Sequence, residues 1–391
     1  MQSQPKHIVI IAGEESGDQH AATFIQTLKQ RQPHLKITGI GGQHMQDAGV
    51  ELISDLARHG VTGISEVLLH VRVIRNAFKK IKAHLDTTKP DLLVLVDYPG
   101  FNLRLARYAK TVLNMRIVYY ISPQIWAWKA NRIHTIRRYI DKMAVILPFE
   151  KKLYEEAGVP VSFVGHPMVE HLNIQESPAA LKQQLNIPEN KTILAILPGS
   201  RRNEIKRLMP ILREAAIYLT QRHPELHIVI PVARSLQKAQ IATFFESTSL
   251  PLTLIEEQAI STVYCSDFVI VASGTASLEC ALLTKPMCII YKTSLITFVA
   301  ACHFMRVKYL GLCNLLQSKM IVPELMQYDC TANDITELMS DLMTDEAKAN
   351  RMVSRLQRLK QSLSHQDAEM SIAELIETEL QATEISHDHS H

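Results

Sequence analysis

Four short loops contain residues that could do chemistry, and each loop directly follows a run of apolar residues. The loops are AGEESGD at 12–18, VDYPGFN at 96–102, LPGSR at 197–201 and ASGTASLE at 272–279. The first two supply carboxylates, a group that can act as an acid or a base. The last two supply glycine and hydroxyl residues just before an expected helix, whose free N–H groups would bind phosphate. These loops are therefore the candidate functional sites.

Arg201 and Asp97 are the two side chains with the most direct chemical interpretation. Arg201 could contact a diphosphate through two hydrogen bonds at once, a geometry that lysine does not reproduce. Asp97 follows a buried strand, so a catalytic role and a plain capping role for the next turn are both open. The glycines and serines near Arg201 have a similar alternative, because they also favour tight turns and helix caps.

Expected strands and helical segments alternate along the chain. This arrangement would place all four loops at the carboxyl ends of strands. Short apolar runs are typical of parallel strands covered on both faces. We expect such strands at 7–11, 36–42, 91–97, 116–122, 142–148, 192–201, 227–233, 252–256, 268–273 and 286–291. This alternation predicts an α/β protein with parallel sheets. Such sheets bind ligands outside the carboxyl ends of their strands, which is where the four loops lie.

The strand pattern restarts near residue 190, which predicts two Rossmann-like domains in tandem. A length of 391 residues agrees with two domains. The expected parts are an N-terminal domain at 1–172, a polar linker at 173–190, a C-terminal domain at 191–343, a helical segment at 344–381 and a polar tail at 382–391. Within the helical segment, an apolar stripe is expected from Met352, Leu356, Leu359 and Leu363.

Composition and absent motifs exclude several classes of protein. The formal net charge of +3 argues against binding nucleic acid through bulk charge. The six cysteines include no C-x-x-C pair, so we expect reduced thiols in a cytosolic protein and no zinc site. The chain has no G-x-G-x-x-G after its first strand, no P-loop, no H-E-x-x-H and no G-x-S-x-G. We therefore expect no metal, no cofactor and no nucleic-acid partner.

The helix expected after Glu66 is strongly basic. Its core stripe would consist of Val67, Val71, Ile74, Phe78, Ile81 and Leu85. Leu68, Leu69 and Val73 fall outside that stripe, among the basic residues Arg72, Arg75, Lys79, Lys80 and Lys82. An amphipathic basic helix with extra apolar residues suits an anionic membrane surface. The alternative is an ordinary surface helix with a solvated basic face. No charge-free apolar run reaches 18 residues, so no membrane-spanning helix is expected.

Nine motifs in order make the chain resemble the lipid-A-disaccharide synthase family over nearly its whole length. They are AGEESGD, GIGGQHMQDAG, VDYPGFNL, YYISPQIWAWK, LPFEK, FVGHP, LPGSR, ASGTASLE and LCNLL. The resemblance implies a GT-B glycosyltransferase fold, in which two Rossmann-like domains face each other across a central cleft that holds the active site.

The resemblance also implies a reaction and its partners. The donor would be UDP-2,3-diacylglucosamine, and the acceptor would be 2,3-diacylglucosamine 1-phosphate (lipid X). Inverting transfer would give the β-1,6-linked lipid A disaccharide 1-phosphate and UDP, as a step of lipopolysaccharide biosynthesis. The enzyme would work in the cytoplasm of a Gram-negative bacterium, bound peripherally to the inner-membrane surface, and it could form a homo-oligomer.

Residue roles follow from the same resemblance. Arg201 and the helix start at 273–275 would stabilise the leaving UDP, and Glu279 would accept hydrogen bonds from its ribose. Donor-site candidates are Gly199, Ser200, Ser273, Gly274, Thr275, Ser277, Glu279 and Asn314. Some family members carry an aspartate where this chain has Gly100. The general base is therefore assigned first to Asp97, and next to Glu14 or Glu15.

Two other functions fit parts of this pattern. A GT-B-like UDP-sugar epimerase would also bind a UDP-sugar, and a non-catalytic UDP-sugar-binding protein would keep the pocket without turnover. The basic amphipathic helix argues against an epimerase of soluble sugars. The retention of Arg201 and several carboxylates argues against a protein that only binds.

Overall fold

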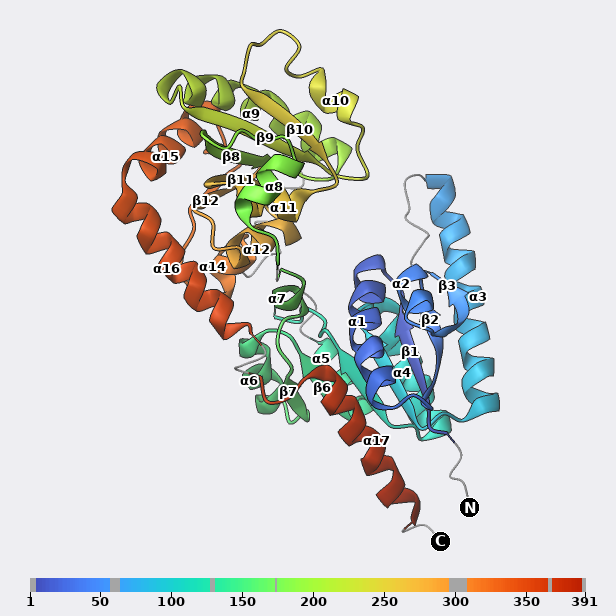
Figure 1. Cartoon of the computed structure of the whole chain (residues 1–391). Helices are drawn as coiled ribbons and strands as arrows, with labels where there is room; N and C mark the ends of the chain where they lie inside the picture. Colours follow the sequence, from blue (N-terminus) through green and yellow to red (C-terminus); the bar gives the residue numbers. More distant parts are fainter. Residues whose placement is uncertain are drawn as a thin grey trace. The chain divides into compact units, whose positions relative to one another are not determined.

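The computed structural model describes residues 5–56, 64–126, 131–172, 174–294, 308–364 and 368–388, with backbone only at 64–70, 170–171 and 383–388. Contacts divide the chain into two compact units, each an α/β domain (Figure 1). Unit 1 contains Met1–Pro167 and Leu363–His391, and unit 2 contains Met168–Ser362. The chain therefore leaves unit 1 once and returns to it for its last helix.

Unit 1 is built on a seven-stranded parallel sheet. The strand order is β3-β2-β1-β4-β5-β6-β7, so the direction of winding reverses between β1 and β4. At that point Ala12, the last residue of β1, pairs with Val96, the last residue of β4. The strands are β1 His7–Ala12, β2 Lys36–Gly41, β3 Glu51–Asp55, β4 Leu92–Val96, β5 Ile117–Tyr120, β6 Lys142–Val145 and β7 Val161–Phe163.

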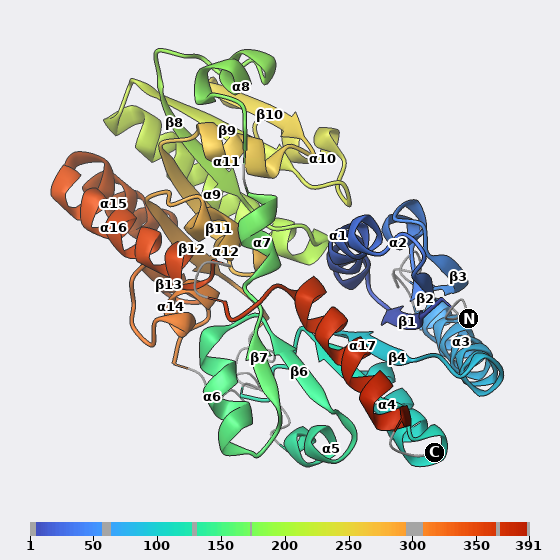
Figure 2. The same cartoon turned by 60° about the horizontal axis from the view of Figure 1, so that its bottom comes forward.

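Helices cover both faces of this sheet because successive strand residues point to opposite sides. One core contains Ile8, Ile10, Val94 and Val118, together with apolar residues of α1 Glu15–Arg31, α2 Gln43–Asp47 and α17 Ile372–Asp388. The other core contains Val9, Ile11, Leu95 and Tyr119, together with residues of α3 Ile64–Thr88, α4 Pro99–Leu113, α5 Arg132–Tyr139 and α6 Pro148–Glu156. Helix α17 contacts β4 and β5, and Figure 2 shows it beside β4.

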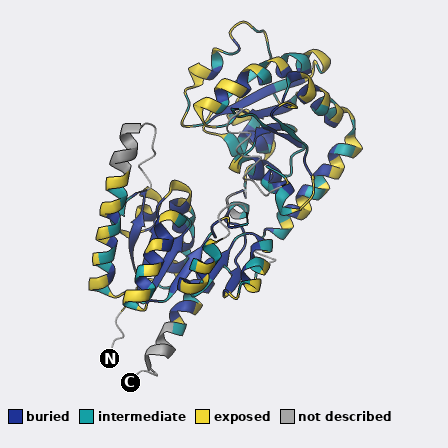
Figure 3. Cartoon of the chain, turned by 180° about the vertical axis from the view of Figure 1, so that it is seen from behind, coloured by how far each residue is buried: buried dark blue, intermediate teal, exposed yellow. Residues whose placement is uncertain are grey.

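Unit 2 repeats the same winding order in a six-stranded parallel sheet. The order is β10-β9-β8-β11-β12-β13, with the reversal between β8 and β11. The strands are β8 Thr192–Leu197, β9 Leu226–Val232, β10 Leu252–Glu256, β11 Phe268–Ala272, β12 Met287–Tyr291 and β13 Glu324–Met326. The helices are α7 Pro167–His171, which begins on the last residue of unit 1, α8 Pro178–Gln184, α9 Arg202–Arg222, α10 Lys238–Ala242, α11 Ala259–Cys265, α12 Thr275–Leu282, α14 Leu312–Leu316, α15 Ala332–Thr344 and α16 Glu346–Ser362. In both units the strands are mostly buried, and the outer helix faces are exposed (Figure 3).

The unit boundaries differ from those expected from the sequence. The expected linker at 173–190 holds α8, whose Leu181 is buried against Ile193 of β8, so this segment is part of unit 2. The expected helical segment at 344–381 is divided between the two units, because α16 belongs to unit 2 and α17 to unit 1. The apolar stripe of Met352, Leu356, Leu359 and Leu363 is buried, as predicted.

Helix α3 packs on unit 1 mostly through the predicted stripe. Ile81 and Leu85 are fully buried, and Ile74 and Phe78 pack against the core. The side chain of Val67 lies outside the described residues, and two positions differ from the prediction. Val71 was assigned to the core stripe, but it is 46% exposed. Val73, which was placed outside the stripe, is partly buried against the core with Ile74 and Phe78. The interpretation of Val73 as a surface residue is therefore wrong. Within the described residues, no helix is long and apolar enough to cross a membrane.

Candidate active site

The turn after β4 holds Asp97 in an uncommon backbone conformation. Asp97 and Tyr98 both have left-handed φ values, of 45° and 46°. Three hydrogen bonds fix the Asp97 backbone: its N–H donates to Tyr120 O at 2.9 Å, and its carbonyl accepts from Asn102 Nδ2 at 2.7 Å and from the Tyr119 hydroxyl at 2.5 Å. Strained backbone of this kind persists only where its surroundings hold it in place, and it clusters at functional sites.

Asp97 and Glu14 lie in the loops that follow the paired strands β4 and β1. Burial, together with a smaller effect of the nearby Glu14 charge, raises the pKa of Asp97 to about 6. Glu14 itself is exposed and occupies the N-cap position of α1, with Glu15 exposed beside it as the first helical residue. The structure thus brings two of the three candidate bases together where the winding of the sheet reverses.

Gly100 lies in the first turn of α4, directly after this turn. A Cβ added at Gly100 would meet nothing within 4 Å, and the residue is exposed. The position therefore has room for the carboxylate that some family members carry there.

Asp18 anchors the loop after β2, a role that sequence reasoning missed. Its buried carboxylate accepts from the N–H groups of Gly42 at 2.6 Å, His44 at 3.0 Å and Met45 at 3.1 Å. Asp18 belongs to α1, whereas these donors form the start of α2. The AGEESGD and GIGGQHM motifs are therefore parts of one hydrogen-bonded unit. Their separation of more than 20 residues hides this contact in the sequence.

Glu150 is a second buried acid that sequence reasoning missed. Its Oε1 accepts from the Ser122 hydroxyl at 2.6 Å and from Trp126 Nε1 at 3.1 Å, while its Oε2 is buried with no hydrogen-bond partner. Burial is the main cause that raises the pKa of Glu150 to about 7, and the charge of Asp97 acts in the same direction. Glu150 therefore holds the loop after β5 through Ser122 and Trp126, close enough to Asp97 to sense its charge.

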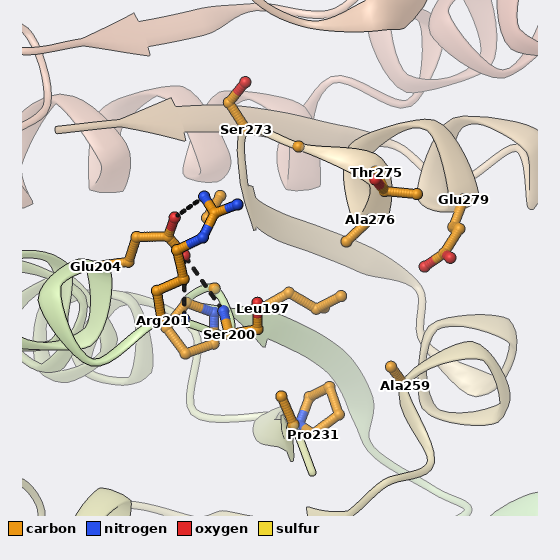
Figure 4. A pocket seen from close by; sticks show the side chains of 15 residues that line it. Leu197, Ser200, Arg201, Glu204, Pro231, Ala259, Ser273, Thr275, Ala276 and Glu279 are labelled. Atoms are coloured by element: carbon orange, nitrogen blue, oxygen red, sulfur yellow. Dashed lines mark hydrogen bonds and ion pairs between the residues drawn. The ribbon is translucent and has the colours of Figure 1, made fainter. Parts of the chain in front are cut away.

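Unit 2 has a pocket at the corresponding point of its own sheet, between the ends of β8 and β11. The pocket has a volume of about 380 Å³. Seven of the predicted donor-side residues line it: Gly199, Ser200, Arg201, Ser273, Gly274, Thr275 and Glu279. Figure 4 shows that the two sets come from opposite walls, one at the start of α9 and the other at the start of α12.

Two helix starts therefore direct backbone N–H groups and partial positive charge at one cavity, an arrangement that suits a phosphate-bearing ligand. The Arg201 side chain is 83% exposed, and its Nη1 forms an ion pair with Glu204 at 3.0 Å. The carboxylate of Glu279 lies at the α12 side of the pocket (Figure 4), and burial raises its pKa. The pocket thus combines cationic, N–H and carboxylate groups.

Two predicted donor residues do not line this pocket. The Ser277 hydroxyl is turned back to Gly274 O, at 2.7 Å, and Ser277 is fully buried. The Asn314 side chain makes four hydrogen bonds within the protein. Its Nδ2 donates to Val322 O and to Glu324 Oε1, and its Oδ1 accepts from the N–H groups of Ile321 and Val322. Ser277 therefore holds the turn at Gly274, and Asn314 holds the segment 321–324.

The predicted membrane residues of α3 have three different outcomes. Arg72 and Arg75 are exposed, so they are available to a surface partner. Val73 packs against the core, as described above. Leu68 and Leu69 have side chains outside the described residues.

Comparisons with known proteins agree on one family. The model of the lipid-A-disaccharide synthetase family matches residues 8–379. Lipid-A-disaccharide synthase 1 of Legionella pneumophila (strain Philadelphia 1) is 54% identical over 373 residues, which cover 95% of this chain and 97% of that protein.

Solved structures with low sequence identity share the fold. The glycotransferase of kitacinnamycin has a TM-score of 0.62 at 13% identity and covers 96% of this chain and 99% of that one. The UDP-GlcNAc 2-epimerase of Neisseria meningitidis, solved with UDP-GlcNAc bound, has a TM-score of 0.60 at 15% identity and covers 91% and 99%. The two domains are those of a GT-B fold, which glycosyltransferases and this epimerase share, so the fold alone does not separate these activities. The match over nearly the whole length decides the question: the chain belongs to the lipid-A-disaccharide synthase family.

Proposed function

We propose that this chain transfers 2,3-diacylglucosamine from its UDP derivative to the 6-hydroxyl of lipid X, with inversion at the anomeric carbon. The products are the β-1,6-linked disaccharide 1-phosphate and UDP. The observation that carries this proposal is the 54% identity to a lipid-A-disaccharide synthase along 95% of the chain. No observation of comparable weight favours the epimerase or the non-catalytic binding protein.

The donor would bind in the pocket of unit 2. Its diphosphate would receive hydrogen bonds from the N–H groups at the starts of α9 and α12, and Arg201 would contact the same phosphates. As the bond to the anomeric carbon breaks, negative charge develops on UDP. Donors that are already in position stabilise that charge without reorganising. Glu279 would accept hydrogen bonds from the ribose hydroxyls.

Asp97 would act as the general base. The oxygen of the 6-hydroxyl forms the new bond to the anomeric carbon, its proton passes to the Asp97 carboxylate, and the bond to UDP breaks with its electron pair leaving on UDP. A pKa of about 6 supports this role, because the group is ionised at neutral pH and still more basic than an ordinary aspartate. Glu14 and Glu15 remain the second choice.

A membrane surface would supply both acylated substrates. Exposed Arg72 and Arg75 on α3 support docking to anionic lipid at the cytoplasmic side of the inner membrane of a Gram-negative bacterium. A homo-oligomer also remains a prediction.

UDP release from UDP-2,3-diacylglucosamine, measured with and without lipid X, tests the proposed reaction. A transferase releases UDP only when lipid X is present, and mass spectrometry then finds the disaccharide 1-phosphate. Release of UDP without lipid X, or conversion of the donor to an epimer, would reject the proposal. A donor that binds and is never turned over would favour the binding protein.

A further inference from the structure

The carboxylate of Glu204 occupies the start of helix α9, inside the pocket of unit 2. Its Oε2 accepts from the backbone N–H groups of Ser200 and Arg201, both at 3.3 Å. Its Oε1 accepts from Arg201 Nη1 at 3.0 Å. Figure 4 shows these contacts on the α9 wall of the pocket.

The loop is shaped to receive this carboxylate. Gly199 has a φ of +104°, and a Cβ added there would lie 2.4 Å from Glu204 Oε2. Any residue larger than glycine would therefore push the carboxylate away from the N–H groups. Glu204 lies three residues into the N-terminus of α9, where an acid is also favoured by the helix dipole.

The groups that hold Glu204 are those that a bound diphosphate would need. Backbone N–H groups at a helix start and an arginine side chain form the usual combination for phosphate. Arg201 is otherwise directed to solvent, with 83% of its side chain exposed. A diphosphate and the Glu204 carboxylate cannot both accept from the same N–H groups, and their like charges repel each other.

We propose that Glu204 is an internal competitor for the diphosphate subsite of the donor pocket. Its carboxylate occupies the subsite when the pocket is empty, moves off when UDP or the UDP-sugar enters, and returns as UDP leaves. Glu204 thus lowers the affinity for UDP and favours its release after the transfer. This inference rests on the proposed donor site.

An ordinary helix cap makes a different prediction from a competitor. A cap stabilises α9. Its loss would not change the affinity for UDP relative to the affinity for a nucleoside that has no phosphate. A competitor acts only on ligands that reach the N–H groups of Ser200 and Arg201. Uridine, which has no phosphate, therefore separates the two roles.

The test measures the Kd of UDP and of uridine by calorimetry for the wild type, Glu204→Gln and Glu214→Gln. Glutamine is nearly isosteric but uncharged, and neutral hydrogen bonds are about half as strong as charge-assisted ones. Glu204→Gln should bind UDP roughly 3- to 10-fold more tightly, a change of the size expected for one such weakened contact, and uridine unchanged. Glu214 lies on the same helix, bonded to Tyr218, so its variant removes the same charge away from the pocket and should leave both constants unchanged.

Three outcomes overturn or redirect the inference. Equal or weaker UDP binding by a folded Glu204→Gln protein would overturn it. If Glu204→Gln unfolds at too low a temperature to be measured, Glu204→Asp replaces it. This variant keeps the charge but shortens the side chain by one methylene, so its carboxylate reaches the loop less well and UDP should bind more tightly. Wild-type UDP affinity in that variant would also overturn the inference. If Arg201→Ala binds UDP as the wild type does, the proposed donor site fails instead.

Discussion

Gly13 lies directly against the ring of Tyr98. A Cβ added at Gly13 would come within 2.2 Å of Tyr98 Cδ1 and within 2.6 Å of Cε1. Tyr98 also stacks on Phe101, with ring centroids 5.8 Å apart. The loop after β1 therefore sets the position of the Tyr98 ring, and with it the left-handed turn that carries Asp97.

Gly13→Ala should lower turnover at least 10-fold, because the ring of Tyr98 must move and the Asp97 turn must move with it. Misplacement by about 1 Å costs on the order of 10²-fold in rate. Gly17→Ala is the matched control. It adds the same methyl four residues later, inside α1, where the nearest atoms lie at an ordinary 3.7 Å. Steady-state assay and thermal melting of both proteins check this prediction, which fails if the two variants behave alike.

Asp97→Asn should keep the fold and UDP binding and cut turnover by about 10² to 10⁴, the usual effect of losing a general base. A simple capping role predicts almost no change, since asparagine is an equally good cap. In the wild type the base must be ionised, so turnover should rise with pH through about 6, where Asp97 loses its proton. A stable Asp97→Asn protein with normal turnover would direct the search to Glu14 and Glu15.

Glu14→Gln should move the acid limb of the pH–rate profile to lower pH. The Glu14 charge raises the pKa of Asp97, so its removal lets Asp97 ionise at a lower pH. Glu15→Gln, which changes the next residue in the same way, should leave that limb in place. Turnover measured from pH 4.5 to 8 separates the two variants. An identical shift in both would contradict the specific effect of Glu14 on the pKa of Asp97.

Glu150→Gln should be more stable than the wild type at pH 8 and nearly equal to it at pH 5. Folding raises the pKa of Glu150 from 4.5 to about 7. The protonated Glu150 side chain therefore makes its full contribution to the free energy of unfolding below pH 4.5. That contribution is lost as the pH rises through 7, and the loss reaches about 3 kcal/mol. Urea unfolding at both pH values measures this difference. The exposed Glu156 on the same helix supplies the control variant, Glu156→Gln, which should show no such pH dependence relative to the wild type.

Arg201→Ala should lower turnover by about 10² or more, as the loss of a positioned charge stabiliser does. Arg201→Lys should recover little, because an ammonium group cannot make the two parallel hydrogen bonds of a guanidinium. Turnover and UDP affinity are the two measurements. Near wild-type values for Arg201→Ala would remove this residue from the mechanism.

A triple variant with Val71, Arg72 and Arg75 changed to serine should bind anionic vesicles more weakly than the wild type. All three side chains are exposed on α3, and attraction between surface charges is screened by salt. Wild-type binding should therefore also weaken as salt is raised. Serine at the exposed Arg351 and Arg358 of α16 removes the same charge elsewhere. Co-sedimentation compares the two, and equal loss in both would mean that net charge, not α3, drives binding.

The central strands and the edge strand β10 could be predicted from the sequence, but the other three edge strands could not. Runs such as those of β1 and β4 are apolar on both faces because helices cover both sides of the sheet. Strands β3, β7 and β13 were missed. β3 is only partly buried and β13 has no fully buried residue, while β7 has only three residues, so none shows a continuous apolar run of useful length.

The site could be predicted where its residues are close in sequence. The walls at 199–201 and 273–275 were found because glycine and hydroxyl residues before a helix are a local pattern. Glu150, Asp18 and Glu204 were missed, since each looks like an ordinary acid in the first turn of a helix. Their contacts to other loops, or to a pocket, become visible only when the chain is folded. On α3, the small residue Ala77 also belongs to the core, so the buried face is wider than the predicted stripe and includes Val73.

The return of the chain to unit 1 has a consequence for how the protein is made. Ile372, Leu375 and Ile376 of α17 complete a core whose other members, such as Leu28 and Val118, are synthesised far earlier. About 200 residues of unit 2 separate the two parts. At 5–20 residues per second, the ribosome needs roughly 10 to 40 s to make them. Throughout that interval the nascent unit 1 lacks α17, so the part of its core over β4 and β5 is incomplete, although α1 and α2 are already available to cover the rest of that face.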